Sequence, residues 1–168
     1  MNMLLKSKIR QLSFQRLAIF ALFLLLTACS ASRKAKVRNK EVNEVIKAAR
    51  SFTGTPYKWG GTTRSGIDCS ALMSNAYSAI SLTLPRTADA QALLGEKIKI
   101  KDLQPGDLLF FATGKKKREI THVGLVTVVK GKEDIKFIHA STSLGVVETN
   151  LYSDYYLKRF RLARRIID

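Results

Sequence analysis

The sequence predicts an α+β domain in which N-terminal helices pack on an antiparallel sheet. Two observations carry this prediction. Apolar residues recur at helical spacing soon after residue 40, whereas from residue 98 onward they follow the period of two that is typical of strands. Helices that precede a run of strands, without alternating with them, favour an antiparallel sheet with the helices laid on it.

Residues 1–28 are predicted to be an export signal that lies outside the domain. Four basic residues lead into an uncharged run of 12 residues, Leu17 to Ala28. That run is shorter than the about 20 apolar residues that span a bilayer; a short membrane anchor is the alternative. The run ends in Leu26-Thr27-Ala28-Cys29, which resembles a bacterial lipobox. We therefore predict that Cys29 is lipidated, with a chance cysteine near an ordinary cleavage site as the alternative.

Residues 29–40 are predicted to form a flexible basic tether, and residues 41–168 the domain. Of the net charge of +16, residues 1–28 carry +4 and residues 29–40 carry +5, which leaves +7 for the domain. This surplus suits an anionic partner, such as a cell-wall polymer or an anionic lipid. Export argues against nucleic acid as the partner.

Three helices are predicted, over residues 41–52, 69–80 and 88–94. The first shows apolar residues at helical spacing, and Gly54 is expected to end it. The second has Asp68 at the N-cap position, and the third has Thr87 there and Gly95 as its stop.

The strands follow the third helix, after a stretch in which Ile98 and Ile100 alternate with lysines. A turn is expected at residues 103–107 and a charged hairpin at 114–119, because these segments gather Pro, Gly and charged residues. The β-branched segment 121–129 is expected to be a central strand. The other predicted strands cover residues 108–112, 135–140, 146–149 and 160–167.

The chemistry centres on Cys69, the one cysteine within the predicted domain, and on the chain's two histidines, His122 and His139. One thiol and two imidazoles are the minimum set for a cysteine hydrolase. Cys69 falls in the first turn of a predicted helix, where the macrodipole is expected to lower the thiol pKa. A small buried hydrophobic role is the alternative for this thiol.

His122 is expected to act as the general base toward Cys69. Strand alternation puts His122 and Gly124 on one face, where the glycine is expected to leave room for a helix packed on the sheet. His139 ends the adjacent predicted strand and is expected to orient the ring of His122. A structural role is the alternative for His139.

Several separated motifs together resemble the NlpC-type cell-wall peptidases, which are bacterial papain-like cysteine hydrolases. The resemblance runs from about residue 43 to 166. The motifs are Gly54-Thr55-Pro56-Tyr57-Lys58-Trp59-Gly60-Gly61, Gly66-Ile67-Asp68-Cys69-Ser70, Leu84-Pro85-Arg86-Thr87, Leu103-Gln104-Pro105-Gly106-Asp107-Leu108-Leu109-Phe110-Phe111, His122-Val123-Gly124 and Ile138-His139-Ala140-Ser141.

The resemblance implies that Cys69 is the nucleophile, His122 the base and His139 the orienting residue. It also implies that the hydroxyl of Tyr57 points toward the oxyanion, beside the N–H of Cys69. A core aromatic is the alternative for Tyr57, and for Trp59 we favour that alternative over substrate binding.

Three further residues are candidates for substrate binding. The resemblance implies that Asp68 and Ser70 contact the amine of the stem peptide; for Asp68, capping the helix is the alternative. Arg86 is a candidate for binding a substrate carboxylate, although we favour a solvated surface arginine.

The resemblance implies an endopeptidase that acts on peptidoglycan stem peptides, at the bond between D-glutamate and the diamino acid. The alternatives are an amidase that cuts between muramic acid and L-alanine, and a non-catalytic module that binds wall peptides. No metal or other cofactor is expected, because one Cys and two His without paired acidic residues do not make a convincing zinc site. We expect a monomer, anchored by lipid in the envelope and facing the periplasm from the outer membrane if the cell has two membranes.

Overall fold

The computed structural model describes residues 33–168, and a division into two units falls between Asn39 and Lys40. Residues 33–50 are helical, so for residues 33–40 the prediction of a flexible tether is wrong. Lys, Arg and Ala favour helix, and this stretch contains neither Gly nor Pro. The predictions on residues 1–28 and on Cys29 lie outside the described residues.

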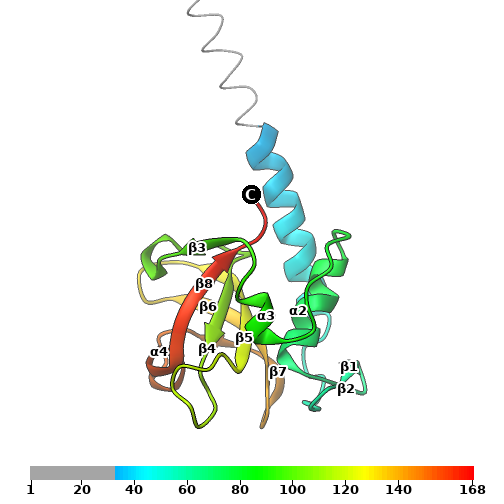
Figure 1. Cartoon of the computed structure of the whole chain (residues 1–168). Coiled ribbons are helices and arrows are strands. Elements are labelled where there is room, and N and C mark those ends of the chain that lie inside the picture. The colour runs from blue at the N-terminus through cyan, green and yellow to red at the C-terminus, as the bar shows by residue number, and fades with distance from the viewer. Residues whose placement is uncertain (1–32) are drawn as a thin grey trace, which may run out of the picture. The chain divides into compact units, whose positions relative to one another are not determined.

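The domain is built on a six-stranded antiparallel sheet with the strand order β3-β8-β4-β5-β6-β7 (Figure 1). This confirms the α+β prediction. A separate two-stranded sheet pairs β1 with β2. The strands are β1 (Thr62–Thr63), β2 (Gly66–Ile67), β3 (Glu96–Ile98), β4 (Leu108–Phe111), β5 (His122–Val129), β6 (Ile135–Ser141), β7 (Gly145–Asn150) and β8 (Phe160–Arg165).

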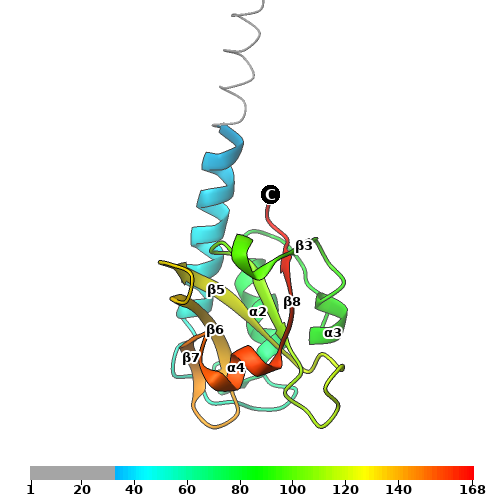
Figure 2. The same cartoon turned by 90° about the vertical axis from the view of Figure 1, so that its left-hand side faces the viewer.

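Helix α2 (Cys69–Ser78) packs on one face of the sheet, and helix α4 (Asp154–Arg159) lies on the other (Figure 2). Strand alternation separates two cores. Leu108, Phe110 and Val123 join the core beneath α2, which also holds the helical residues Val42, Val45, Ile46 and Ala49. Leu109, Phe111 and Phe137 join the core beneath Tyr156 and Phe160.

The predicted helices and strands are present, with changed ends. Helix α2 ends at Ser78, and helix α3 covers only Ala88–Gln91. A 3-10 helix, η1 (Ile100–Asp102), replaces the expected strand alternation after Ile98. Helix α4 and the pair β1–β2 were not predicted, because these segments are too short for a hydrophobic period to show.

The turn before β4 is fixed by a buried ion pair. Asp107 accepts from Arg165, with Nε at 2.8 Å from Oδ1 and Nη2 at 2.8 Å from Oδ2, and also from the N–H of Gln104. Gly106 has φ +92°, and a Cβ there would lie 2.7 Å from Cγ2 of Val42. The motif at residues 103–107 therefore joins β4 to β8 and lets the backbone approach the N-terminal helix.

Candidate active site

Cys69 is the first residue of α2, directly after the N-cap residue Asp68. The Asp68 carboxylate accepts from the N–H of Ala71 at 2.8 Å, which confirms the predicted cap. Cys69 is a free thiol and is buried. Its sulfur accepts hydrogen bonds from backbone N–H groups of α2 and of Val123. The thiol therefore lies next to the start of β5, where His122 is found.

The resting thiol is protonated at neutral pH. Burial raises the pKa of the Cys69 thiol to about 11, and the N–H groups of Val123 and Ser70 only partly oppose this effect. The expectation that the helix N-terminus lowers this pKa is therefore wrong, because desolvation of the thiolate outweighs the favourable dipole. A thiolate in this site must form by transfer of its proton to a neighbouring base.

His122 begins β5 and lies on the sheet face opposite α2. Its ring lies 6.0 Å from that of Phe111 and stacks on Tyr156 at 6.3 Å. The expectation that Gly124 makes room for a helix is wrong: a Cβ there would meet Phe137 at 2.5 Å. The thiol instead lies beside the start of β5, where its sulfur accepts from the N–H of Val123, the residue that follows His122.

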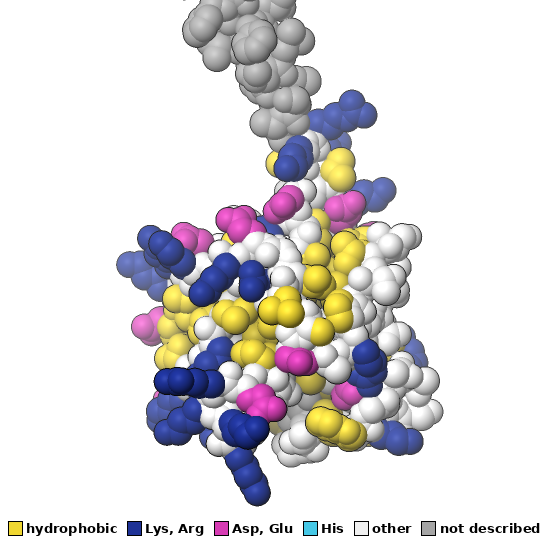
Figure 3. Space-filling view, in the orientation of Figure 1, with side chains coloured by type: hydrophobic (Ala, Val, Ile, Leu, Met, Phe, Trp, Pro, Cys, Tyr) yellow, Lys and Arg dark blue, Asp and Glu magenta, His cyan; other side chains and the backbone are white. Residues whose placement is uncertain are grey.

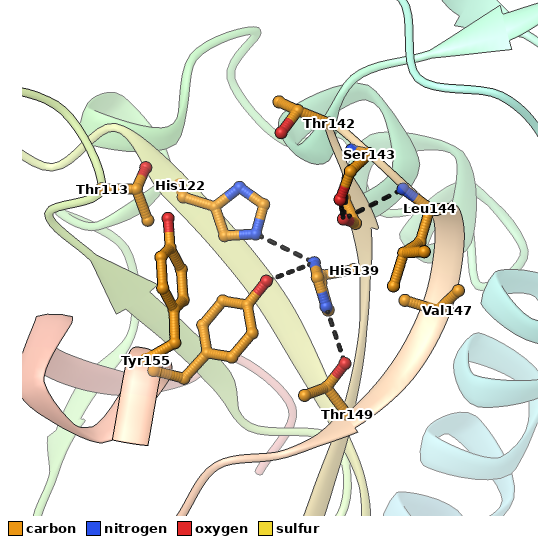
Figure 4. Close-up of a pocket in the computed structure, with 11 residues that line it drawn as sticks. Thr113, His122, His139, Thr142, Ser143, Leu144, Val147, Thr149 and Tyr155 are labelled. Carbon is orange, nitrogen blue, oxygen red and sulfur yellow. Dashed lines mark hydrogen bonds between the residues drawn. The ribbon is translucent and has the colours of Figure 1, made fainter. Parts of the chain in front are cut away.

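His139 pairs directly with His122, as the sequence predicted. Nε2 of His122 lies 3.1 Å from Nδ1 of His139, and Nε2 of His139 lies 3.1 Å from the hydroxyl of Thr149 (Figure 4). Burial lowers the pKa of His122 to about 4. Burial, together with the charge of His122, lowers the pKa of His139 to about 3. Both rings are therefore neutral at pH 7.

This hydrogen-bond chain couples the tautomers of the two rings. If Nε2–H of His139 donates to Thr149, then Nδ1 of His139 is free to accept from Nε2–H of His122. The remaining nitrogen of His122, Nδ1, then carries a lone pair, and it points away from His139 in Figure 4. This nitrogen is the one suited to take a proton from the thiol.

Thr149 and Tyr156 are site residues that the sequence did not reveal. The Tyr156 hydroxyl lies 3.5 Å from Nδ1 of His139, and its ring packs against both histidines. Tyr156 lies in α4, which was not predicted. Thr149 lies in a predicted strand, but its place beside His139 follows from the β6–β7 register, in which His139 faces Val147.

Tyr57 and Trp59 lie on the loop before α2, and both line the cavity that holds the thiol. Tyr57 is partly buried and pairs with Ile67 in an isolated bridge. Burial, followed by the nearby Cys69 and Asp68, raises the pKa of Tyr57. Trp59 is 85% exposed, so our preference for a core aromatic there is wrong: its ring is available to a ligand at the cavity's edge.

Asp68, Ser70 and Arg86 form one hydrogen-bonded cluster beside the thiol. The Arg86 guanidinium donates to both oxygens of Asp68, at 3.0 and 2.5 Å, and to the Ser70 hydroxyl at 2.9 Å. Burial raises the pKa of Asp68, but the hydrogen bonds from Arg86 and the N–H of Ala71 outweigh it and lower that pKa overall. Arg86 is exposed at the surface, as we favoured, but a bidentate pair with Asp68 that the sequence did not reveal fixes its guanidinium.

The site has two cavities. The thiol cavity, of about 460 Å³, is lined by Tyr57, Trp59, Cys69 and the Asp68 cluster, with Asp89 and Glu119. The histidine cavity, of about 360 Å³, is lined by His122, His139 and a group of hydroxyl side chains from β6, β7 and α4 (Figure 4). Both volumes fall within the range of small-ligand sites.

A thiol at the start of a helix and two paired imidazoles on adjacent strands are the residue set of a cysteine hydrolase. A family model described as the NlpC/P60 family matches residues 54–165, a span that includes Cys69, His122 and His139. The chain therefore belongs to the NlpC/P60 family.

Similar proteins include curated relatives and solved structures. The chain is 39% identical over 151 residues to a protein of Escherichia coli (strain K12) named probable endopeptidase NlpC, covering 85% of this chain and 94% of that one. It is 30% identical to the E. coli murein DD-endopeptidase MepS/murein LD-carboxypeptidase, covering 88% and 89%. A solved structure of a Bacillus cereus NlpC/P60 family protein superposes on this chain with a TM-score of 0.68 and is 30% identical to it. The superposition covers 76% of this chain and 40% of that longer chain.

Proposed function

We propose that this chain is a thiol-dependent endopeptidase that cleaves the stem peptides of peptidoglycan. One observation carries the proposal: the hydrogen-bonded series Thr149–His139–His122 ends at the start of β5, where the N–H of Val123 donates to the Cys69 sulfur. Family membership and relatives named endopeptidases support the reaction class and the cell-wall substrate.

The reaction begins with proton transfer from Cys69 to His122 as the sulfur attacks the carbonyl carbon. The N–H of Cys69 and the hydroxyl of Tyr57 stabilise the oxyanion. The protonated His122 then gives its proton to the leaving amine, and a thioester remains on Cys69. Water, activated by the same imidazole, hydrolyses the thioester and restores the thiol.

The charged cluster beside Cys69 is suited to the half of the substrate that remains on the enzyme. Asp68 and Ser70 border the thiol cavity, so we assign them to the free amine of the stem peptide. Arg86 is 46% exposed at its side chain while paired with Asp68, and we assign it to a carboxylate of the same half. Trp59 covers the apolar part of the peptide.

Two bonds are candidates for cleavage. The family resemblance favours the bond between D-glutamate and the diamino acid. The relative named a murein DD-endopeptidase favours the crosslink between D-alanine and a diamino acid. The masses of the products distinguish the two bonds. Cleavage of the D-glutamyl bond shortens a stem peptide, whereas cleavage of the crosslink separates two stem peptides.

We also propose that Cys29 is lipidated and holds the domain in the envelope, at the periplasmic face of the outer membrane if the cell has two membranes. The motif Leu26-Thr27-Ala28-Cys29 supports this proposal. Within residues 33–168, no helix has the length and apolar character needed to cross a bilayer. On the face shown in Figure 3, Lys and Arg side chains are widely spread, which suits an anionic wall or membrane.

The test is to incubate the protein with purified muropeptides, beside the Cys69→Ala variant, and to identify products by mass spectrometry. Cleavage within the stem that is absent in the variant supports the proposal. Release of an intact stem from the sugar would establish the amidase instead. Binding without cleavage by either form would leave a wall-binding protein.

A further inference from the structure

The histidine cavity differs in chemistry from the thiol cavity beside it. Its walls carry the hydroxyl groups of Ser141, Thr142, Ser143 and Thr149, with Leu144 and Tyr155. Among the described residues that line it there is no Lys, Arg, Asp or Glu, whereas the thiol cavity has Asp68, Arg86, Asp89 and Glu119. The two cavities should therefore accept chemically different parts of a substrate.

The positions of Cys69 and His122 assign each cavity to one half of the substrate, the acyl half or the leaving half. The acyl half stays bonded to Cys69 and therefore remains in the thiol cavity. The leaving amine receives its proton from His122, so the leaving half departs past the imidazole, where the histidine cavity opens.

We propose that the histidine cavity binds the leaving half and selects a leaving residue whose nearest carboxyl group is held in an amide linkage. The proposal rests on the proposed function, whose cleaved bond it specifies. A free carboxylate entering the cavity would lose water and would find no cationic side chain among the described residues that line it. A peptide amide, by contrast, can both donate to and accept from the hydroxyl groups that line the wall.

The imidazoles do not supply the missing positive charge. Burial lowers the pKa of both rings to about 4 or below, so they are neutral when substrate binds at pH 7. The Arg159 guanidinium is not part of the cavity lining: it stacks 3.8 Å from the ring centroid of Tyr155 and donates to the Tyr155 carbonyl. The basic residues Lys115 to Arg118, on the hairpin after Thr113, are exposed, and charges so exposed are screened over about 8 Å at physiological salt.

This selectivity separates the two candidate bonds in peptidoglycan built on diaminopimelate. When the D-glutamyl bond is cut, the carbon that bears the released amine has its carboxyl joined to D-alanine as an amide. When a D-alanyl crosslink is cut, the carbon that bears the released amine carries a free carboxylate. A terminal D-alanine released from a stem also carries a free carboxylate on the carbon that bears its amine. The cavity therefore favours cleavage of the D-glutamyl bond.

The test uses two L-alanyl-γ-D-glutamyl-diaminopimelate peptides that differ only at the carboxyl beside the cleaved bond, which is free in one and a carboxamide in the other. We expect kcat/KM to be at least 10-fold higher for the carboxamide, in both 0.15 M and 0.5 M NaCl. Equal rates for the two peptides would overturn the proposal.

A charge added to the cavity should change this preference. Leu144 lines the cavity and is 70% exposed, so Leu144→Lys should fold and should narrow the ratio of the two rates. Leu93 is 78% exposed and lines neither cavity, so Leu93→Lys adds the same charge elsewhere and should leave the ratio unchanged. Equal ratios in both variants would contradict the assignment of the cavity.

Binding to the Cys69→Ala protein, measured by calorimetry, repeats the comparison without turnover. If the wild type cleaves neither peptide but the Cys69→Ala protein still prefers the carboxamide, the proposed reaction is wrong and the cavity assignment stands. If the Cys69→Ala protein binds both peptides equally, the cavity assignment fails, whatever the reaction.

Discussion

The two cavities of the active site lie on either side of the first residue of β5 and are built on different principles. The thiol cavity is charged and holds its charges in a fixed network around Asp68. The histidine cavity is lined by hydroxyl and aromatic groups and keeps two imidazoles neutral. The thiol cavity is suited to recognising charged groups of a ligand, and the histidine cavity is suited to holding a neutral base that can accept and return a proton.

The largest expected effect is the loss of the proposed base, which lines the histidine cavity. His122→Ala should lower kcat by about 10³-fold, because general base and acid catalysis are both removed. The dissociation constant of a stem peptide whose charged half fills the thiol cavity should change little. A peptide-binding titration beside steady-state kinetics checks both; a comparable loss of binding would show that the cavities do not act separately.

Acid should destabilise the histidine cavity in particular. The pKa values of His122 and His139 are lowered in the folded state, so these residues stabilise the fold above about pH 6.5 and lose that contribution as the pH falls toward 4 and then 3. At about 1.36 kcal/mol per pKa unit, His122 contributes roughly 3 kcal/mol and His139 roughly 5 kcal/mol. Urea unfolding at pH 7 and pH 4, for the wild type and for the double variant His122→Gln/His139→Gln, measures the pH-dependent loss of the free energy of unfolding. An equal loss of stability in both proteins would contradict the burial of neutral imidazoles.

Thr149 should act by positioning His139. Thr149→Val keeps the shape of the side chain but removes the hydrogen-bond partner of Nε2 of His139, so the tautomers of the two rings lose this constraint. We expect kcat to fall about 10-fold or more with KM unchanged, and Thr149→Ser to restore most of the rate. Nitrogen-15 NMR of the imidazoles reads the tautomers directly. Imidazole spectra of Thr149→Val that match those of the wild type would exclude a role for Thr149 in positioning His139.

The smallest expected effect is on the charged side. Arg86→Gln should raise KM about 10-fold for stem peptides with a free carboxylate in the acyl half, with kcat within about 2-fold, because a bidentate charged donor is lost. Arg50→Gln is a matched control. Both arginines have side chains that are 46% exposed and pair with a carboxylate, but Arg50 lines neither cavity. Equal KM values for Arg86→Gln and Arg50→Gln would show that Arg86 does not bind the substrate.

The sequence by itself determined the fold class and the reactive residues. Hydrophobic period and turn residues are local signals, so they predicted α2, the cap at Asp68 and the strands β4 to β8. The pairing of His122 with His139 also followed, since neighbouring antiparallel strands bring side chains on the same face within reach of one another, here with an offset from direct pairing.

Only the tertiary structure decided how those residues are arranged and charged. Burial is a property of the whole core, so the raised pKa of Cys69 and the lowered pKa values of the histidines could not be read from helix position alone. The face on which His122 lies, the partner of Arg86 and the hydroxyl of Thr149 depend on contacts between segments far apart in the chain. Local sequence patterns carry no record of such contacts, because packing sets them after the elements have formed.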